Sequence, residues 1–523
     1  MSADLLLRQF ERIAEEPGAV DRLRDFTRKL AVNGSLLHAD RLRWSDFTLG
    51  DLGRWGSGGT PSKSHPEYYE GDIPWLVIGD LNDGRVSSAA STIGQLGLAN
   101  SSAKLVEPET VLVAMYGSIG KLGLAGIRCA TNQAIAHCVV NPVLVTPVYL
   151  MVALRSMRRE LLARGQGGTQ PNISQTILKA WPIRLPPLAE QQRIVAKVDE
   201  LMALCDQLEA AQSEREARRD RLRTTSLRNL ISPDETKENV NFILRHSTRM
   251  ISKPDHVAGV RQAILALAMR GRLVPQAPED EPVAALVSSI RSKRPATTRS
   301  YAQATDDTDY TDSYPTTWAV TTIGALFDVY VGSTPSRTDS SLWGGEIPWV
   351  SSGEVAFNRI RSTREVITGK ALGTSSTRLH PPGTVMLSMI GQGKTRGQAA
   401  ILEVAAAHNQ NCASIRVADT PVPPEYIYLM LAERYERTRL QAEGGSQPAL
   451  NKEKVRAIRF GLPPLAEQNF IVAKVDELMA VCDELEQSLA TEQTERARLL
   501  EALLHDALKD PLPVQELEPV GAL

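Results

Sequence analysis

The segment LSMIGQGKTRGQ (387–398) has the residue types and spacing of a nucleotide-binding turn. It contains Gly391 and ends its glycine-rich part in Gly393-Lys394-Thr395. In a P-loop, backbone N–H groups surround the phosphates, the Lys reaches the β- and γ-phosphates, and the Ser/Thr binds Mg²⁺. The segment therefore raises the hypothesis of an NTPase.

Two features weigh against a P-loop. The first Gly of the pattern is missing, because Ser388 occupies its position. A parallel segment, VAMYGSIGKLGL (113–124), contains Gly120-Lys121 but no Ser/Thr after the Lys. A repeat that keeps Gly and Lys but loses the Mg²⁺ ligand is not built around a nucleotide. We expect a strand–turn–strand element with a basic tip instead.

Other catalytic signatures are incomplete. NPVL (141–144) lacks the Pro-aromatic ending of the motif with which amino-methyltransferases hold the target amine. PDETK (233–237) has nuclease-like residues but lies in a linker without a core strand. The eight His show no HExxH or HxxxH spacing, and the five Cys contain no CxxC. We therefore predict no catalytic residues, no metal site and no autonomous enzyme.

The remaining chemistry is that of binding. Hydroxyls, amides and single cations recur in the loops of both halves of the chain, and such groups suit phosphates and base edges. The candidate DNA-contacting residues are Thr60, Ser62, Lys63, Tyr116, Ser118, Lys121, Gln170, Asn172, Thr334, Ser336, Arg337, Arg359, Arg361, Gln392, Lys394, Thr395, Arg396 and Gln447. The alternative is that the Thr-Pro-Ser and Asn-Gln elements only pin turns. We favour this alternative for Asn132-Gln133 and Asn409-Gln410, and phosphate contact for the Lys and Arg tips.

Positive charge gathers locally on a chain whose net charge is −2. Residues 337–396 contain eight Lys or Arg and four Asp or Glu, a surplus of +4. A local basic surplus is expected of a surface that contacts nucleic acid.

The chain repeats itself. GSGGTPSKSHPEYYEGDIPW (56–75) parallels YVGSTPSRTDSSLWGGEIPW (330–349) at an offset of 274. Further along, LPPLAEQQRIVAKVDELMALCDQLE (185–209) parallels LPPLAEQNFIVAKVDELMAVCDELE (462–486) at an offset of 277. A weaker echo relates LRDFTRKLAVNGSLL (23–37) to VRQAILALAMRGRLV (260–274). Each half therefore contains a short helix, a globular unit and a long helix.

The two globular units, which we call module 1 and module 2, are expected to be mixed α/β. TVLVAMY and TVMLSMI read as strands, and PVYLMVALRSMRRELLAR and PEYIYLMLAERYERTRLQ as amphipathic helices. The predicted domains are an N-terminal helical segment (1–43), module 1 (44–188), a long helix (189–231), a linker (232–256), a central helical segment with a flexible lead (257–315), module 2 (316–465), a second long helix (466–509) and a tail (510–523).

Apolar residues follow alternating steps of four and three along both long helices, as in a coiled-coil seam. The seam residues are Ile194, Val198, Leu201, Cys205, Leu208, Ile471, Val475, Leu478, Cys482 and Leu485, and Leu499 and Leu503 resume the stripe. Packing of each helix on a local core is the alternative. We favour a helix–helix seam because the stripe is long and its far side is highly charged.

The composition is that of a soluble globular protein, with 42% hydrophobic and 23% charged residues. No apolar run approaches the roughly 18–20 residues of a membrane span. The first 17 residues form a charged amphipathic stretch rather than a signal peptide. The odd number of Cys and the lack of CxxC make a disulfide framework unlikely and suit a reducing compartment. We therefore expect a cytoplasmic protein.

The doubled motifs GGTPS…GDIPW, YGSIGKLG, TNQ, GGTQPNI and LPPLAEQQRIVAKVDEL resemble those of the specificity subunit of type I restriction–modification enzymes. The resemblance covers nearly the whole chain. It implies two target-recognition domains, joined by long helices that form an antiparallel coiled coil with a pseudo-twofold axis. Each domain would read one half of a split double-stranded DNA site, and the helices would set the spacer.

The resemblance also implies partners and cofactors. Two modification subunits would bind S-adenosylmethionine and methylate adenine at N6, and restriction subunits would translocate and cleave DNA with ATP and Mg²⁺ in phage defence. This chain itself would bind no cofactor. A helix over 189–231 would be roughly 60–65 Å long, which limits the spacer to about 18 bp. A single-chain nuclease or methyltransferase and a DNA-free coiled-coil adaptor are the rival hypotheses.

Overall fold

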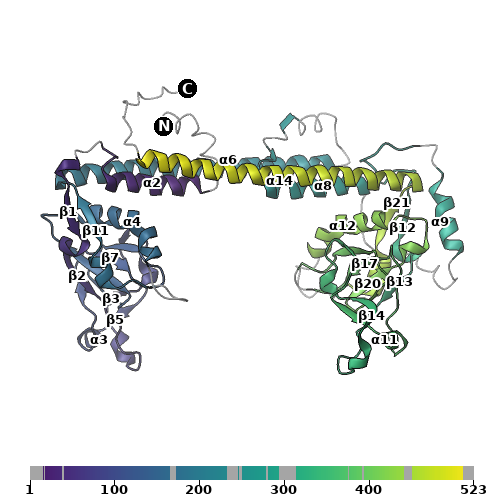
Figure 1. Cartoon of the computed structure of the whole chain (residues 1–523), viewed down its shortest axis with the longest axis horizontal. Helices are drawn as coiled ribbons and strands as arrows, with labels where there is room; N and C mark the ends of the chain where they lie inside the picture. Colours follow the sequence, from purple (N-terminus) through teal and green to yellow (C-terminus); the bar gives the residue numbers. More distant parts are fainter. Residues whose placement is uncertain are drawn as a thin grey trace. The chain divides into compact units, whose positions relative to one another are not determined.

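The computed structural model describes residues 16, 18–37, 41–164, 172–231, 245–246, 250–277, 281–293, 314–374, 376–391, 394–440 and 450–509. The chain divides into two compact units, one of residues 1–217 with 492–523 and one of residues 218–491. Each unit contains one module with its adjoining helices (Figure 1). The fold is mixed α/β, as predicted.

Module 1 is built on three small sheets. A five-stranded sheet has the order β2-β10-β7-β8-β4, a four-stranded sheet the order β5-β3-β9-β6, and β1 pairs with β11. Its elements are β1 (Ser45–Thr48), β2 (Gly53–Ser57), β3 (Ile73–Leu76), β4 (Arg85–Val86), β5 (Thr92–Ile93), α3 (Gln95–Ala99), β6 (Leu105–Val106), β7 (Val111–Ala114), β8 (Leu122–Ala125), β9 (Cys129–Thr131), β10 (Ile135–Val140), α4 (Pro147–Ala163), α5 (Gln175–Lys179) and β11 (Pro182–Leu185).

Module 2 repeats this plan. Its five-stranded sheet has the order β13-β20-β17-β18-β15, its second sheet the order β16-β14-β19, and β12 pairs with β21. Its elements are β12 (Ala319–Thr322), α10 (Ile323–Leu326), β13 (Val329–Val331), β14 (Trp343–Val350), β15 (Asn358–Ile360), β16 (Glu365–Ile367), α11 (Gly369–Thr374), β17 (Val385–Ser388), β18 (Ala399–Leu402), β19 (Ala407–His408), β20 (Cys412–Ile415), α12 (Pro424–Leu440), α13 (Lys452–Ala457) and β21 (Arg459–Leu462). The predicted strands and amphipathic helices are confirmed as β7, β17, α4 and α12.

One close approach is common to both modules and explains a glycine in each. The N–H of Gly59 donates to the carbonyl of Thr131 at 2.9 Å, and that of Ser333 donates to the carbonyl of His408 at 3.1 Å. A Cβ on the preceding glycine would lie 1.8 Å from the Thr131 oxygen at Gly58 and 1.9 Å from the His408 oxygen at Gly332. Only glycine can occupy these positions while the loop binds the strand.

The long helices are α6 (Leu188–Ile231) and α14 (Leu465–Lys509), and both begin just after Pro-Pro. A buried carboxylate in the first turn of each accepts a hydrogen bond from a tryptophan of the module. Trp44 Nε1 donates to Glu190 Oε1 at 3.1 Å, and Trp318 Nε1 donates to Glu467 Oε1 at 3.0 Å. The start of each long helix is thereby fixed to its own module.

The short helices α2 (Ala19–Asn33) and α8 (Val257–Met269) contact the long helices through matching charge contacts. Arg24 binds Asp206 at 2.6 Å and Glu209 at 2.7 Å. Arg261, its counterpart, binds Asp483 at 2.7 Å and Glu486 at 2.5 Å. The short-helix echo in the sequence therefore corresponds to one contact made twice.

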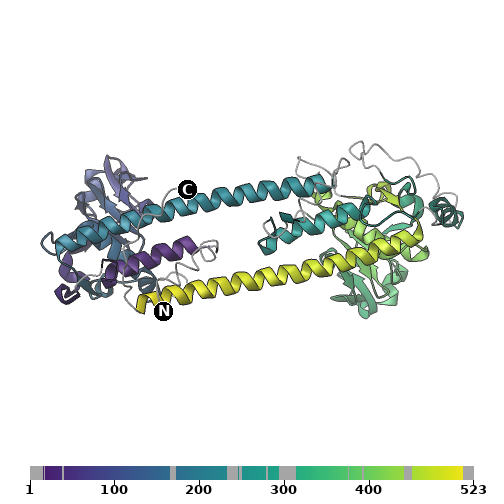
Figure 2. The ribbon, with the colours of Figure 1, turned by 90° about the horizontal axis from the view of Figure 1, so that it is seen from above.

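Each short helix also meets the other long helix. In the first unit, Phe26 of α2 packs with Leu500, Leu503 and Leu504 of α14, and Figure 2 shows α2 alongside both long helices. In the second, Gly259 of α8 lies against Leu227 of α6. Close packing on a glycine lets the two helix backbones approach each other.

All ten predicted seam residues are buried or half-buried. Ile194 and Val198 belong to the core of module 1, and Ile471 and Val475 to that of module 2. Further along, Cys482 joins a cluster that includes residues of α8. In the second unit, therefore, the stripe meets the module first and the short helix next. The pairing of the two long helices as an antiparallel coiled coil stays a prediction.

One detail of the stripe was wrong. Leu499 is 42% exposed, whereas Leu500, Leu503 and Leu504 are buried. The apolar face of α14 has rotated by one position at this point because it meets α2 rather than a module.

A helix, α9 (Val283–Ser292), packs against α10 and β12 in the second unit. Most of the predicted linker, flexible lead and tail lies outside the described residues.

Candidate nucleic-acid interface

The glycine-rich segment is a hairpin turn. It joins β17 to the antiparallel β18, and the equivalent turn of module 1 joins β7 to β8. A P-loop instead opens a helix whose N-terminus faces the phosphates. The strand–turn–strand prediction is therefore confirmed, and we call these segments turn 1 (115–121) and turn 2 (389–398, of which 392 and 393 lie outside the described residues).

The two turns do not align as their sequences suggested. The N–H of Gly120 donates to the Ala114 carbonyl at 2.9 Å, and that of Gly397 donates to the Ser388 carbonyl at 2.8 Å. Gly120 therefore corresponds to Gly397, and the two Gly-Lys pairs do not match. Turn 2 contains three extra residues, 392–394. Pairing Lys121 with Lys394 was wrong, because Lys394 lies in this insertion and has no counterpart in module 1.

The exposed side chains of the turns differ between the modules. Tyr116 in turn 1 is 45% exposed, and Ile390 at the same position of turn 2 is 44% exposed. Lys394 is exposed, whereas Lys121 is half-buried with its Nζ 3.4 Å from the Ile78 carbonyl. Ile390 was not predicted as a contact, although its alignment with Tyr116 could have indicated it. An exposed apolar side chain can contact a thymine methyl group.

Other candidates lie at or near the turns. Ser118 and Asn172 are exposed, and Asn172 forms a β-bridge with Tyr116, so the structure brings these two predicted residues together. Thr395 and Arg396 are half-buried in turn 2. Gln170, Gln392 and Gln447 lie outside the described residues.

The Thr-Pro-Ser and Asn-Gln elements pin each other in both modules. Thr60 Oγ1 donates to Gln133 Oε1, and Thr334 Oγ1 donates to Gln410 Oε1 at 2.5 Å. Trp75 Nε1 donates to the Gly59 carbonyl, and Trp349 Nε1 to the Ser333 carbonyl. The turn-pinning interpretation of Gln133 and Gln410 is confirmed, and it extends to Thr60 and Thr334, whose hydroxyls bind within the module.

The next residues of these loops face solvent. Ser62 and Ser336 are exposed and bind the hydroxyls of Ser64 and Thr338, at 2.6 and 2.8 Å. They form the base from which the side chains of residues 63 and 337 project.

Lys63 and Arg337 occupy the same position but differ in environment. Arg337 Nη2 donates to Glu365 Oε2 at 2.9 Å, and its guanidinium carbon lies 3.9 Å from the centre of the Trp343 ring. The hydrogen bond from Arg337 lowers the pKa of Glu365. Lys63 is exposed, and no carboxylate within the described ranges forms an ion pair with it. Its charge is therefore available to a ligand, whereas that of Arg337 is matched internally.

The predicted basic surplus of module 2 is also partly matched. Arg359 Nη2 binds Glu425 Oε1 at 3.0 Å, and Arg361 Nε binds Glu403 Oε2 at 2.6 Å. Both carboxylates lie outside the 337–396 window. Adding these two acids to the four already counted lowers the surplus from +4 to +2. The window count was too high because it omitted acids that are distant in sequence.

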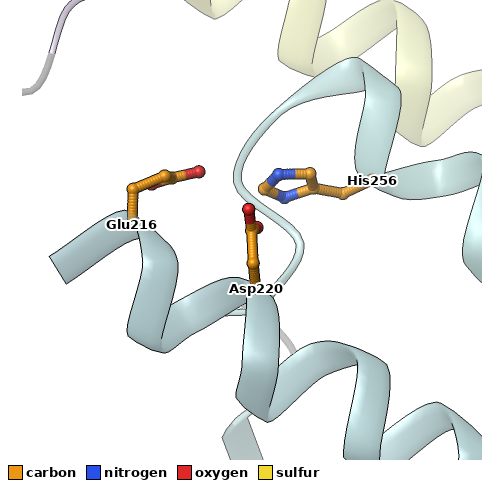
Figure 3. Close-up of side chains that lie close together, drawn as sticks. All are labelled: Glu216, Asp220 and His256. Atoms are coloured by element: carbon orange, nitrogen blue, oxygen red, sulfur yellow. The ribbon is translucent and has the colours of Figure 1, made fainter. Parts of the chain in front are cut away.

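One group of metal-ligand residue types occurs on the helices. Asp220 of α6 and His256 of the short helix Pro254–His256 approach each other in the second unit, and Glu216 lies one turn before Asp220 on α6 (Figure 3). Arg223 already pairs with Asp220 at 3.1 Å, and His256 Nδ1 accepts from the Ser252 N–H at 3.2 Å. We assign no metal to these residues.

In the described part of the chain, no helix is both long and apolar enough to cross a bilayer.

Comparison with known proteins identifies the modules. A family model, the type I restriction modification DNA specificity domain, matches residues 42–217 and again residues 315–494. The EcoEI specificity subunit of Escherichia coli is 23% identical over 372 residues, covering 67% of this chain and 62% of the relative. The EcoR124I/EcoR124II specificity subunit is 30% identical over 167 residues, covering 31% and 41%. The chain thus spans less than two thirds of the length of these curated relatives.

A solved structure is similar over most of the chain. The HsdS subunit from Thermoanaerobacter tengcongensis is 18% identical, with 90% of this chain and 97% of that chain covered and a TM-score of 0.44. The two family matches coincide with module 1 and module 2, each with the start of its long helix. Together they cover more than half of the sequence, and the chain belongs to the family defined by the type I restriction modification DNA specificity domain.

Proposed function

We propose that this chain is the DNA-reading subunit of a type I restriction–modification complex, with each module reading one half of a bipartite site. The observation that carries the proposal is the contrast within the repeat. The two modules share strand order and turn-pinning bonds, but their exposed turn and loop residues differ. A shared framework with different exposed side chains suits two readers of two different sequences.

The contacts divide by chemistry. Lys63 and Lys394 are exposed single cations suited to phosphates, which position a protein on DNA. Tyr116, Asn172 and Ile390 offer the amide and apolar contacts that distinguish base edges. Arg337, Arg359 and Arg361 would need to leave their carboxylates to reach DNA, so we assign them a secondary part in binding.

The catalytic chemistry would belong to partners. We propose that two modification subunits supply S-adenosylmethionine and adenine-N6 methylation, and that restriction subunits supply ATP- and Mg²⁺-dependent translocation and cleavage. The long helices, α6 of 44 residues and α14 of 45 residues, would carry these subunits and set the spacer between half-sites. This chain would act in the bacterial or archaeal cytoplasm without a cofactor of its own.

A module exchange tests the proposal. Residues 44–188 would be replaced by the equivalent module of a family member with a known half-site, and methylated adenines would be mapped in cells. We expect a new first half-site and an unchanged second half-site and spacer. If recognition of both half-sites is lost or neither changes, the proposal of one reader per module is wrong.

A binding assay separates this function from the enzymatic alternative. The chain alone should bind neither S-adenosylmethionine nor ATP in calorimetric titrations. Tight binding of S-adenosylmethionine would support a methyltransferase, and ATP binding that Lys394→Ala removes would restore the P-loop hypothesis.

A further inference from the structure

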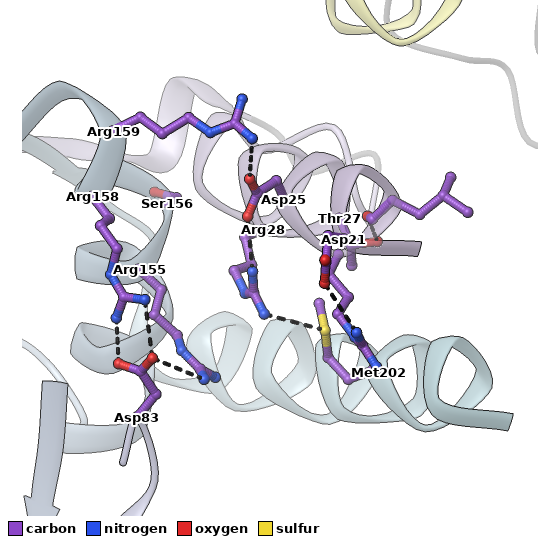
Figure 4. Close-up of polar contacts among 12 residues, drawn as sticks. Asp21, Asp25, Thr27, Arg28, Asp83, Arg155, Ser156, Arg158, Arg159 and Met202 are labelled. Carbon is purple, nitrogen blue, oxygen red and sulfur yellow. Dashed lines mark hydrogen bonds and ion pairs between the residues drawn. The ribbon is translucent and has the colours of Figure 1, made fainter. Parts of the chain in front are cut away.

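Two residues outside turn 1, Arg158 of α4 and Asp83 of a loop, form hydrogen bonds to the backbone at the end of this turn. Arg158 of α4 donates through Nε to the Gly120 carbonyl at 2.7 Å and through Nη1 to Asp83 Oδ2 at 2.9 Å (Figure 4). Asp83 Oδ1 in turn accepts from the N–H of Leu122, the first residue after the turn, at 2.9 Å. Burial raises the pKa of Asp83, but the hydrogen bonds from Arg158 and Leu122 outweigh it and lower that pKa overall.

Turn 2 is contacted by a tyrosine of α12, which belongs to an aromatic pair instead of an ion pair. Tyr435 of α12 donates its hydroxyl hydrogen to the Lys394 carbonyl at 2.5 Å. The Tyr435 ring packs edge-to-face on Phe357, with ring centres 4.9 Å apart. Lys394 is therefore fixed through its backbone while its side chain remains exposed.

These two pairs occupy equivalent positions. Asp83 and Phe357 both have positive φ, +64° and +54°, which is uncommon for residues other than glycine. Their N–H groups donate to equivalent strand residues, Leu122 and Ala399, each at 2.8 Å. Arg158 and Tyr435 stand at the same point of α4 and α12, eleven residues after the initial prolines. An ion pair in module 1 has thus been exchanged for an aromatic pair in module 2.

Both turns depend on an external support for their shape. Gly117 and Gly120 in turn 1, and Gly391 and Gly397 in turn 2, have positive φ. Glycine gives a turn access to this region but also gives it more conformations to lose. A hydrogen bond to a turn carbonyl from a rigid helix restricts these conformations before any ligand binds, which favours binding.

We propose that Arg158 and Tyr435 are positioning residues that set the half-site preference of their modules by fixing the backbone of turn 1 and turn 2. Neither residue needs to touch DNA. The inference rests on the proposed function, because it requires that the turns contact DNA. The carbonyl that Tyr435 binds belongs to Lys394, one of the extra residues of turn 2. Tyr435 therefore positions the exposed Lys of that turn.

The test uses the full chain assembled with its modification subunits. Affinity would be measured for a cognate duplex and for duplexes in which one half-site is replaced. Tyr435→Phe removes only the hydroxyl and keeps the ring on Phe357. Loss of one hydrogen bond should weaken cognate binding about three- to tenfold. Binding to the duplex that lacks half-site 2 should not change, and Arg158→Gln should show the mirror pattern for half-site 1.

A matched control lies in the same helix. The Tyr426 hydroxyl donates to the Gly461 carbonyl at 2.7 Å, and Gly461 lies in β21 rather than in turn 2. Tyr426→Phe removes the same kind of bond and should lower the melting temperature while leaving half-site discrimination unchanged. Equal losses of discrimination in Tyr426→Phe and Tyr435→Phe would indicate a purely structural role and overturn the inference.

Lys394→Ala distinguishes failure of the inference from failure of the proposed contact. If Lys394→Ala weakens binding but Tyr435→Phe does not alter discrimination, turn 2 contacts DNA without being positioned by Tyr435, and the inference is wrong. If neither substitution has an effect, turn 2 is not a DNA contact, and both the proposed contact and the inference fail.

Discussion

Module 1 holds its turn with the ion pair Asp83–Arg158, whereas module 2 holds the equivalent turn with the aromatic pair Phe357–Tyr435. A second exchange occurs in the core. Thr131 of module 1 corresponds to His408, because each supplies the carbonyl that binds the Thr-Pro-Ser loop. Val106 corresponds to His380 in the adjacent strand position.

These exchanges preserve a backbone geometry while the side chains that maintain it change. The residues exchanged are in contact as Asp83–Arg158 in module 1, and as Phe357–Tyr435 and His380–His408 in module 2. Among the positions that stay identical are those where the backbone itself is constrained, such as Gly58 and Gly332. The comparison therefore separates contacts that both modules share, such as the close approach at Gly58 and Gly332, from contacts that differ between them, such as the supports of the two turns.

The largest expected difference between the modules is their response to acid. Burial lowers the pKa of His380 to about 3, helped by repulsion from His408, Arg416 and Arg378, and burial lowers the pKa of His408 to about 4. Among the described residues, His408 Nε2 has no hydrogen-bond partner. Module 1 has one comparable group, His137, whose pKa is lowered by burial and by Lys104.

The sign of the effect follows from these directions. A His whose folded pKa is lowered stays neutral when folded but is protonated in the unfolded chain, so stability is complete above about pH 6.5 and falls as the pH drops toward the folded pKa. Between pH 7 and pH 5 we expect a loss of about 2 kcal/mol for each of the two module 2 imidazoles, His380 and His408. The protection factors of the β20 amides, which correct for the slower intrinsic exchange in acid, should therefore fall more steeply between pH 7 and pH 5 than those of the β10 amides.

Installing the residues of module 1 would sharpen this comparison. His380→Val with His408→Thr should flatten the pH dependence of module 2, even if the smaller side chains lower its stability at pH 7. His137→Ser should likewise flatten that of module 1. An unchanged pH slope in the double variant would show that these imidazoles are not the source.

The second prediction concerns what the modules share. Gly58→Ala and Gly332→Ala would each force a Cβ against a carbonyl that already binds the loop. We expect each to destabilise its own module by about 3 kcal/mol, measured by hydrogen exchange of the five-stranded sheets. Gly79→Ala and Gly353→Ala are the controls, since a Cβ there meets nothing closer than 4.0 Å. If only one of the two substitutions destabilises its module, the close approach of loop and strand does not constrain both modules alike.

The smallest expected effect tests the contrast between Lys63 and Arg337. Lys63→Ala should weaken binding to all duplexes alike and reduce the slope of log affinity against log salt by about one. Arg337→Ala should change affinity by less than about twofold, since Glu365 already matches its charge. Glu365→Gln should increase affinity by releasing Arg337. A larger loss for Arg337→Ala than for Lys63→Ala would show that DNA displaces Glu365.

Most of the elements were predictable from local patterns. Short β-branched runs predicted β7 and β17, and the apolar stripes predicted the long helices α6 and α14. Pinning of Gln133 and Gln410 was also expected, because the same two residues recur in both halves. These features depend on periodicity and on residues repeated at a fixed offset, which one sequence displays directly.

The turn alignment and the charge balance were not predictable. Both turns contain Gly-Lys, so sequence comparison placed the three extra residues elsewhere, and only the ladder between Gly397 and Ser388 located them. The carboxylates that match Arg359 and Arg361 come from residues 42 to 66 positions later in the chain. The paired acids of Arg24 and Arg261 were likewise missed, as they lie more than 180 residues away.

The sequence by itself determined the duplication, the α/β character of the modules and the extent of the long helices, because strand and helix periodicity are properties of neighbouring residues. Tertiary structure decided which of the repeated polar residues remain available to a ligand. Lys63 and Lys394 stay exposed, while Thr60, Thr334 and Arg337 bind within their modules. That outcome depends on partners brought close only by folding, and no local pattern encodes the distance to them.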